Sequence, residues 1–183
     1  MKCTICGNSP SRVQFNGQPF CMDCYNAMMA EEFEVDLPNL PKIFSMDDVN
    51  GVQRIFEVER QVMSTAIVLT ARERWEHGYE FAVDGELQAD QHALFDRLKE
   101  KTKQGLSETY VATGQFPNGM PYTSVKGNQL RGVLSYHETD SEGPLVIIDG
   151  KPFTWIEVGH LLQAFEGFQV KIEMKDITDA WDE

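Results

Sequence analysis

The residues best suited to do chemistry are four cysteines near the start of the chain. Cys3 and Cys6 form one Cys-x2-Cys pair, and Cys21 and Cys24 form a second pair after fourteen intervening residues. Zn²⁺ prefers four ligands in a tetrahedron, and two residues between cysteines let one tight turn supply two neighbouring corners. The spacing therefore predicts that all four cysteines bind one zinc ion.

This zinc site is expected to be structural. Four cysteine ligands fill the coordination shell and leave no position for a catalytic water. The alternative is a redox-active cysteine pair. Two cysteine pairs at this spacing indicate a metal site more strongly than a redox site. Residues 25–183 contain no cysteine, and this distribution is typical of metal-bound thiols in a reducing compartment rather than of a disulfide scaffold.

Two short strands and a helix are expected to position these thiols. Strands over 12–15 and 18–20 flank Asn16-Gly17, the dipeptide most typical of a type I′ hairpin. Residues 23–33 carry apolar side chains at helical spacing, which places Cys24 in the first helical turn, where the dipole favours a thiolate. The resulting module over 1–35 resembles the treble-clef type of zinc finger.

A second group of candidate residues lies in the second half of the chain. The segment 117–131 offers Lys126 and Arg131 as ligands for a small anion, and His137 ends an expected strand beside acidic residues at 138 and 140. The alternative interpretation is a polar surface loop. The chain has no phosphate-binding loop, nucleophile elbow, HExxH or GxGxxG motif, so no catalytic residue is predicted.

The charge balance restricts the partners. The chain carries 16 basic and 29 acidic residues, for a net charge of −13. Nucleic acids and anionic lipids attract basic surfaces, so both are disfavoured as partners. No apolar run approaches the roughly 20 residues of a membrane helix, and the first residues do not form a secretory signal. We expect a cytoplasmic protein that contacts another protein or a second copy of itself.

Beyond a linker over 36–44, residues 45–183 are expected to form one α+β domain with a mostly antiparallel sheet and two main helices. One helix is predicted over 90–104 with Gly105 as its stop, and the other begins at a capping box of Thr154 and Glu157. The remaining expectations are strands over 56–62, 66–70, 79–83, 130–137, 145–148, 151–153 and 168–174, a hairpin turn at Asp149-Gly150 and a loop over 113–127.

Two stretches, residues 79–110 and 146–176 (VIIDGKPFTWIEVGHLLQAFEGFQVKIEMKD), resemble an uncharacterised family of bacterial proteins that also tend to begin with paired cysteines. The resemblance implies a bacterial, cytoplasmic protein and no known activity. Together the observations favour a zinc-binding, non-enzymatic protein that serves interaction or architecture. The alternative is a small-ligand-binding protein or an enzyme with its site near residues 117–137.

Overall fold

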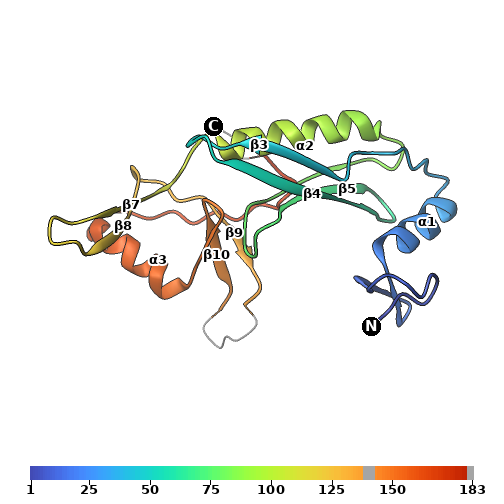
Figure 1. Cartoon of the computed structure of the whole chain (residues 1–183), viewed down its shortest axis with the longest axis horizontal. Helices are drawn as coiled ribbons and strands as arrows, with labels where there is room; N and C mark the ends of the chain where they lie inside the picture. The colour runs from blue at the N-terminus through green and yellow to red at the C-terminus, as the bar shows by residue number, and fades with distance from the viewer. Residues whose placement is uncertain (138–142, 181–183) are drawn as a thin grey trace.

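The structure is a computed structural model that describes residues 1–137 and 143–180. Three parts follow one another along the long axis of the molecule (Figure 1). The cysteine-containing part lies at one end, a sheet covered by a long helix lies in the middle, and the other end is built around the hairpin of β7 (Val111–Gln115) and β8 (Pro121–Val125).

The first part contains β1 (Val13–Phe15), β2 (Gln18–Phe20) and α1 (Met22–Glu32). The hairpin prediction is confirmed, because Asn16 and Gly17 both have positive φ, 49° and 76°, as a type I′ turn requires. The predicted helix is also confirmed, with Cys21 as its N-cap and Cys24 in its first turn.

The middle part is a four-stranded antiparallel sheet in the order β3-β4-β5-β6, formed by Ile43–Asp47, Gln53–Val62, Ile67–Glu73 and Glu80–Gly85. Helix α2 (Gln91–Leu106) packs on one face of it (Figure 1). Asp90 caps this helix by accepting hydrogen bonds from the amides of His92 and Ala93. Strand β3 begins inside the segment expected as a linker, and Leu37 and Leu40 of that segment pack against the core.

Gly105 does not end α2, so that prediction is wrong. The helix continues to Leu106, and Ser107 caps it in a right-handed conformation. A Cβ at position 105 would lie 2.2 Å from the Phe81 ring on β6. The glycine is therefore there because the helix and the sheet approach each other closely, not because the backbone turns.

The last part contains β7 (Val111–Gln115), β8 (Pro121–Val125), β9 (Val133–Ser135), β10 (Leu145–Ile148), β11 (Lys151–Phe153), α3 (Trp155–Leu162) and the 3₁₀ turn η1 (Gln163–Phe165). β7 pairs with β8, and the other three strands form a sheet in the order β11-β10-β9. The Asp149-Gly150 turn and the capping box of Thr154 and Glu157 are confirmed.

The expected loop over 113–127 is wrong, because most of it forms the β7–β8 hairpin. Its turn-forming residues are concentrated between the strands, where Gly119 has φ of 83°. Gly114 sits within β7 opposite Tyr122, whose ring would be 2.6 Å from a Cβ at that position. The composition typical of a loop thus reflects one tight turn and one close contact within a hairpin.

The expected strand over 168–174 is also wrong. Residues 166–176 form neither helix nor strand, and all the apolar side chains of the alternating pattern face solvent. Their exposed fractions are 70% for Phe168, 77% for Val170, 72% for Ile172 and 75% for Met174. The pattern is that of a strand, yet the described residues supply no neighbouring strand for it.

The fold is α+β, with antiparallel sheets and helices that pack beside them. The main core lies between α2 and the four-stranded sheet and includes the fully buried Phe56, Leu69 and Leu98. In the part of the chain that the structure describes, no helix combines the length and apolarity needed to cross a bilayer.

Candidate metal centre

The four cysteines come together at one point. One ligand atom from each of Cys3, Cys6, Cys21 and Cys24 lies within 4.8 Å of all the others. The Sγ atoms of Cys6 and Cys21 are 3.9 Å apart. Since a Zn–S bond is about 2.3 Å long, tetrahedral zinc separates its sulfurs by roughly 3.8 Å. The donor set and its spacing therefore fit a zinc ion, and the cluster can hold a metal.

Local backbone structure places each pair. The first pair lies in a turn where the Gly7 amide donates to the carbonyl of Cys3 at 3.0 Å and Gly7 has φ of 66°. The amide of Cys3 in turn donates to the carbonyl of Ser9. The second pair begins α1, and hydrogen bonding of the Tyr25 amide to the Cys21 carbonyl starts the helix. A knuckle turn and a helix start thus face each other.

Hydrogen bonds prepare part of the cluster for negative charge. Backbone amides, that of Cys21 first and then that of Cys6, lower the pKa of Cys3 to about 6. The amides of Ser9 and Asn8 lower the pKa of Cys6. The neighbouring Cys21 thiol and burial raise the pKa of Cys24 to about 12. Four adjacent thiols cannot all ionise without a cation among them, so complete deprotonation requires a bound metal.

An apolar layer surrounds the inner side of the cluster. Cys3 and Cys21 are buried, as are Phe20, Tyr25 and Met29, and Val62 of β4 joins the same group. The ring of Phe15 meets that of Tyr25 edge-on at 5.8 Å. Cys6 alone of the four thiol residues is exposed. The cysteine module therefore shares its small core with the central sheet.

Asn26 of α1 attaches the module to the edge of β4. Its side chain donates to the carbonyl of Arg60 at 2.6 Å and accepts from the amide of Val62 at 2.8 Å. The pairing of β3 with β4 stops at Glu57, so none of the described strands pairs with this stretch of β4 on that side. The Asn26 amide replaces two backbone partners of a neighbouring strand.

Further hydrogen bonds fix the chain that follows α1. The guanidinium of Arg60 donates to the carbonyl of Pro38 at 3.0 Å and to Oε1 of Gln91 at 2.7 Å. Gln91, in the first turn of α2, donates to the carbonyl of Asp36 at 2.7 Å. The segment between the module and β3 is therefore held against the central part at several points.

Sequence reasoning did not find Asn26. The available signal was a polar residue on the same helical face as Met29 and Ala30, all of them buried. Its partners lie 34 and 36 residues later in the chain. Nothing in the local pattern indicates which strand edge the amide satisfies.

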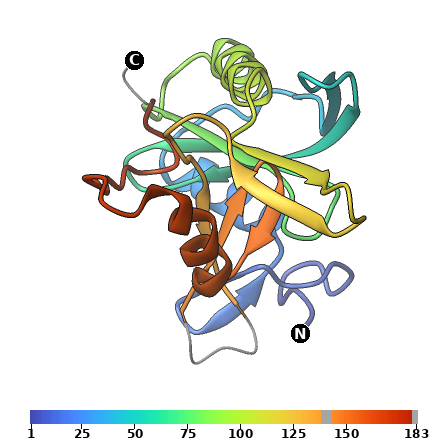
Figure 2. The ribbon, with the colours of Figure 1, turned by 90° about the vertical axis from the view of Figure 1, so that its left-hand side faces the viewer.

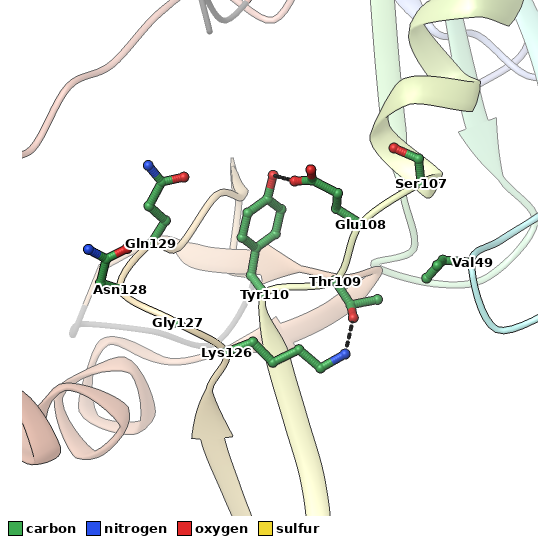
Figure 3. Close-up of a pocket in the computed structure, with 9 residues that line it drawn as sticks. All are labelled: Val49, Ser107, Glu108, Thr109, Tyr110, Lys126, Gly127, Asn128 and Gln129. Carbon is green, nitrogen blue, oxygen red and sulfur yellow. Dashed lines mark hydrogen bonds between the residues drawn. The ribbon is translucent and has the colours of Figure 1, made fainter.

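A polar cleft of about 390 Å³ lies where α2 ends and β7 begins (Figure 3). Ser107–Tyr110 form one wall, and 126–129 form the other. The ammonium of Lys126 donates to the hydroxyl of Thr109, and the Tyr110 hydroxyl donates to Glu108 at 3.1 Å. The cleft thus contains Lys126, one of the three residues that the sequence suggested for ligand binding.

The other two suggested residues lie outside the lining of this cleft. The guanidinium of Arg131 is 5.9 Å from the centre of the Tyr110 ring, so it lies against one residue of the cleft wall. His137 follows the end of β9 that is farther along the chain from Arg131. At that end Ser135 pairs with Leu145, whereas Val133, nearer to Arg131, pairs with Ile147. The acidic residues at 138 and 140 lie outside the described residues.

A buried charge network lies within the middle part of the chain. Arg54 forms ion pairs with Asp48 at 2.8 Å and with Glu73 at 3.0 Å, and its guanidinium lies 5.6 Å from the centre of the Tyr79 ring. Burial alone would raise the pKa of Asp48, but the Val52 amide and Arg54 outweigh it and leave that pKa lowered. Burial raises the pKa of Tyr79 to about 12.

The turn between β10 and β11 lies against this network. A Cβ at Gly150 would be 2.7 Å from the Tyr79 ring. The carboxylate of Asp149 accepts hydrogen bonds from the amides of Tyr110 and Val111, both at 2.8 Å. The start of β7 is therefore tied to the β10–β11 turn, beside the cleft.

Comparison with known proteins divides the chain in the same way. No curated protein and no solved structure matches it. Three family models, each of a different domain of unknown function, match at residues 2–36 (DUF7685), 38–107 (DUF7686) and 110–179 (DUF7713). The second boundary falls between α2 and β7, inside the segment expected as one domain. Three families of unknown function, one after another, therefore cover the chain.

Proposed function

We propose that the four cysteines bind one structural zinc ion, and that the protein is a non-enzymatic, zinc-stabilised interaction protein. The observation that carries the proposal is the set of four thiols supplied by one turn and by the start of α1, the helix that attaches to β4 through Asn26. Zinc at this site holds α1 in place, and α1 completes the edge of the sheet. The metal thus stabilises a module too small to fold alone.

The charge of the chain supports a protein partner rather than a nucleic acid. The net charge of −13 repels a phosphate backbone. Thiolate ligands survive best in a reducing compartment, so we place the protein in the cytoplasm. The spacing of the pairs and the hairpin-then-helix order support the resemblance to a treble clef.

Native mass spectrometry of the purified full chain tests the zinc proposal. We expect one zinc ion per chain, and loss of that mass in the Cys24→Ser variant. Thr4→Ser is the matched control, because it changes the neighbour of a ligand and keeps the hydroxyl that donates to the carbonyl of Pro19. Full-length protein without zinc, or a Cys24→Ser variant that keeps it, would contradict the proposal.

A second candidate function is the binding of a small anion in the cleft. Lys126 lines it, and the guanidinium of Arg131 lies 5.9 Å from the ring of Tyr110, which also lines the cleft. Titration with inorganic phosphate, followed by amide chemical shifts of residues 107–110 and 126–129, would test it. Shifts that saturate in the wild type and vanish in Lys126→Ala would support this function, and shifts equal in both proteins would exclude it.

A further inference from the structure

The segment 168–175 (FQVKIEMK) has the pattern of a strand, but no strand among the described residues pairs with it. Apolar residues alternate with polar ones, as in a strand with one apolar face. In the described part of the chain these residues form no helix or strand, and Val170, Ile172 and Met174 are each more than 70% exposed. Such a row of apolar side chains marks a surface that another chain covers.

The segment begins shortly after the η1 turn and ends where the chain is held against α2. The ring of Phe168 meets that of Phe165 at 5.5 Å, and its amide donates to the carbonyl of Phe165. After the segment, the ammonium of Lys101 on α2 donates to the carbonyls of Ile177 and Asp179, both at 2.7 Å. The chain between these anchors runs along the outside of the molecule (Figure 2). Because its end is held against α2, the segment loses less conformational freedom on pairing than a free tail would.

The charged side chains of the segment indicate which partner it binds. Lys171 and Glu173 form an ion pair at 2.7 Å on one side of the chain, two residues apart, as they do in extended backbone. We propose that this segment pairs antiparallel with the same segment of a second copy, with Ile172 on the two-fold axis. In this register Lys171 of each copy lies opposite Glu173 of the other.

The register follows from charge and from the apolar pattern together. With Ile172 on the axis, Val170 lies opposite Met174 and Ile172 opposite itself, so one face of the paired strands is entirely apolar. With Lys171 on the axis, two lysines would lie opposite each other, which destabilises a pair of strands. The segment carries two lysines and one glutamate, so it does not contribute to the negative net charge of the chain.

The apolar face of a two-stranded ribbon also needs a covering layer, because two strands alone are marginally stable. The same part of the chain exposes Trp155, Ile156 and Leu162 on α3. These side chains are available to pack against the ribbon when two copies meet. The dimer belongs to the last part of the chain and goes beyond the proposed role of zinc, from which it is independent.

Sedimentation analysis of the zinc-loaded full chain and its charge variants tests the register. We expect a dimer for the wild type. Lys171→Glu places like charges opposite each other at two symmetric positions and should weaken the dimer by about tenfold. Glu173→Lys should do the same, and the double variant should restore the wild-type affinity. Mixing the two single variants should yield heterodimers, since their charges are then complementary.

Lys103→Glu is the matched control, because it makes the same change of charge at an exposed site on α2. Ile172→Cys adds a covalent readout: the thiols of two copies meet only if residue 172 lies on the axis, so oxidation should cross-link this variant and not Gln169→Cys. The zinc content of each variant is measured in parallel. A monomeric wild type, or charge variants that dimerise equally well with zinc in place, would overturn the proposal. A wild-type dimer that contains no zinc would leave this proposal standing and contradict the proposed function instead.

Discussion

The side-chain amide of Asn26 takes the place of a neighbouring strand beside Val62. Its oxygen accepts a hydrogen bond from the Val62 backbone amide at 2.8 Å. The same side chain donates to the carbonyl of Arg60, and it is only 5% exposed. One residue of the cysteine-bearing helix thus satisfies two backbone groups of the central sheet.

Replacing Asn26 by Ala should therefore destabilise the protein. The buried Val62 amide and the partly buried Arg60 carbonyl would lose these partners, and an unsatisfied buried group costs about 1–3 kcal/mol. Urea unfolding should report the loss, and the Val62 amide should exchange faster with solvent. Ala27→Ser, on the exposed side of the same helix, is the control and should change stability by less than about 0.5 kcal/mol. Equal stabilities for the two variants would contradict this role of Asn26.

Removal of zinc should unfold the first part of the chain and leave the central core folded. The main core of Phe56, Leu69 and Leu98 does not include the cysteines, whereas the small core around Cys3 and Cys21 takes Val62 from the sheet. After chelation, hydrogen exchange should become fast over residues 1–36 and at Val62, and stay slow at Leu69 and Leu98. Adding zinc back should restore protection, and uniform loss across the chain would show that the two cores unfold together.

Gly105→Ala should destabilise the protein although alanine favours helices. The added Cβ would meet the Phe81 ring at 2.2 Å, and overpacking of this kind costs about 1–3 kcal/mol. Gly159→Ala in α3 is a matched control, because a Cβ there meets nothing within 4 Å and should stabilise by up to about 1 kcal/mol. Thermal unfolding of both variants checks the contrast. Adding Phe81→Leu to Gly105→Ala should recover part of the loss.

Asp48 should contribute to acid sensitivity. Its pKa is lowered in the folded protein from the ordinary value of 3.8, so its contribution is complete above that value and disappears as the pH falls through the folded pKa. Asp48→Asn should cost about 1–3 kcal/mol at neutral pH, because Arg54 loses a charged partner.

The measurement is the difference in unfolding free energy between wild type and Asp48→Asn, followed from about pH 6 down to about pH 2. The difference should shrink below about pH 4, whereas zinc loss at low pH affects both proteins and cancels. Asp96→Asn, which removes an exposed ion pair with Lys99, should cost less than about 0.5 kcal/mol at any pH. A constant difference for Asp48→Asn would mean that its carboxylate charge is not what stabilises the fold.

The sequence by itself determined the features that a few adjacent residues encode. The spacing of the cysteines predicted their cluster, and Asn16-Gly17 and Asp149-Gly150 predicted two hairpin turns that the structure contains. Thr154 with Glu157 predicted the start of α3. These signals are local, because each depends on backbone conformation or hydrogen bonds within one turn.

Only the tertiary structure decided how these elements meet. Asn26 finds its partners on β4, Gly105 makes room for Phe81, and Lys126 shares a cleft with Tyr110, across separations that no local pattern records. The alternating pattern of 168–174 was misleading for the opposite reason, since a strand also needs a neighbour to accept its hydrogen bonds. Periodicity records which face of a segment is apolar, whereas the fold decides what, if anything, lies against that face.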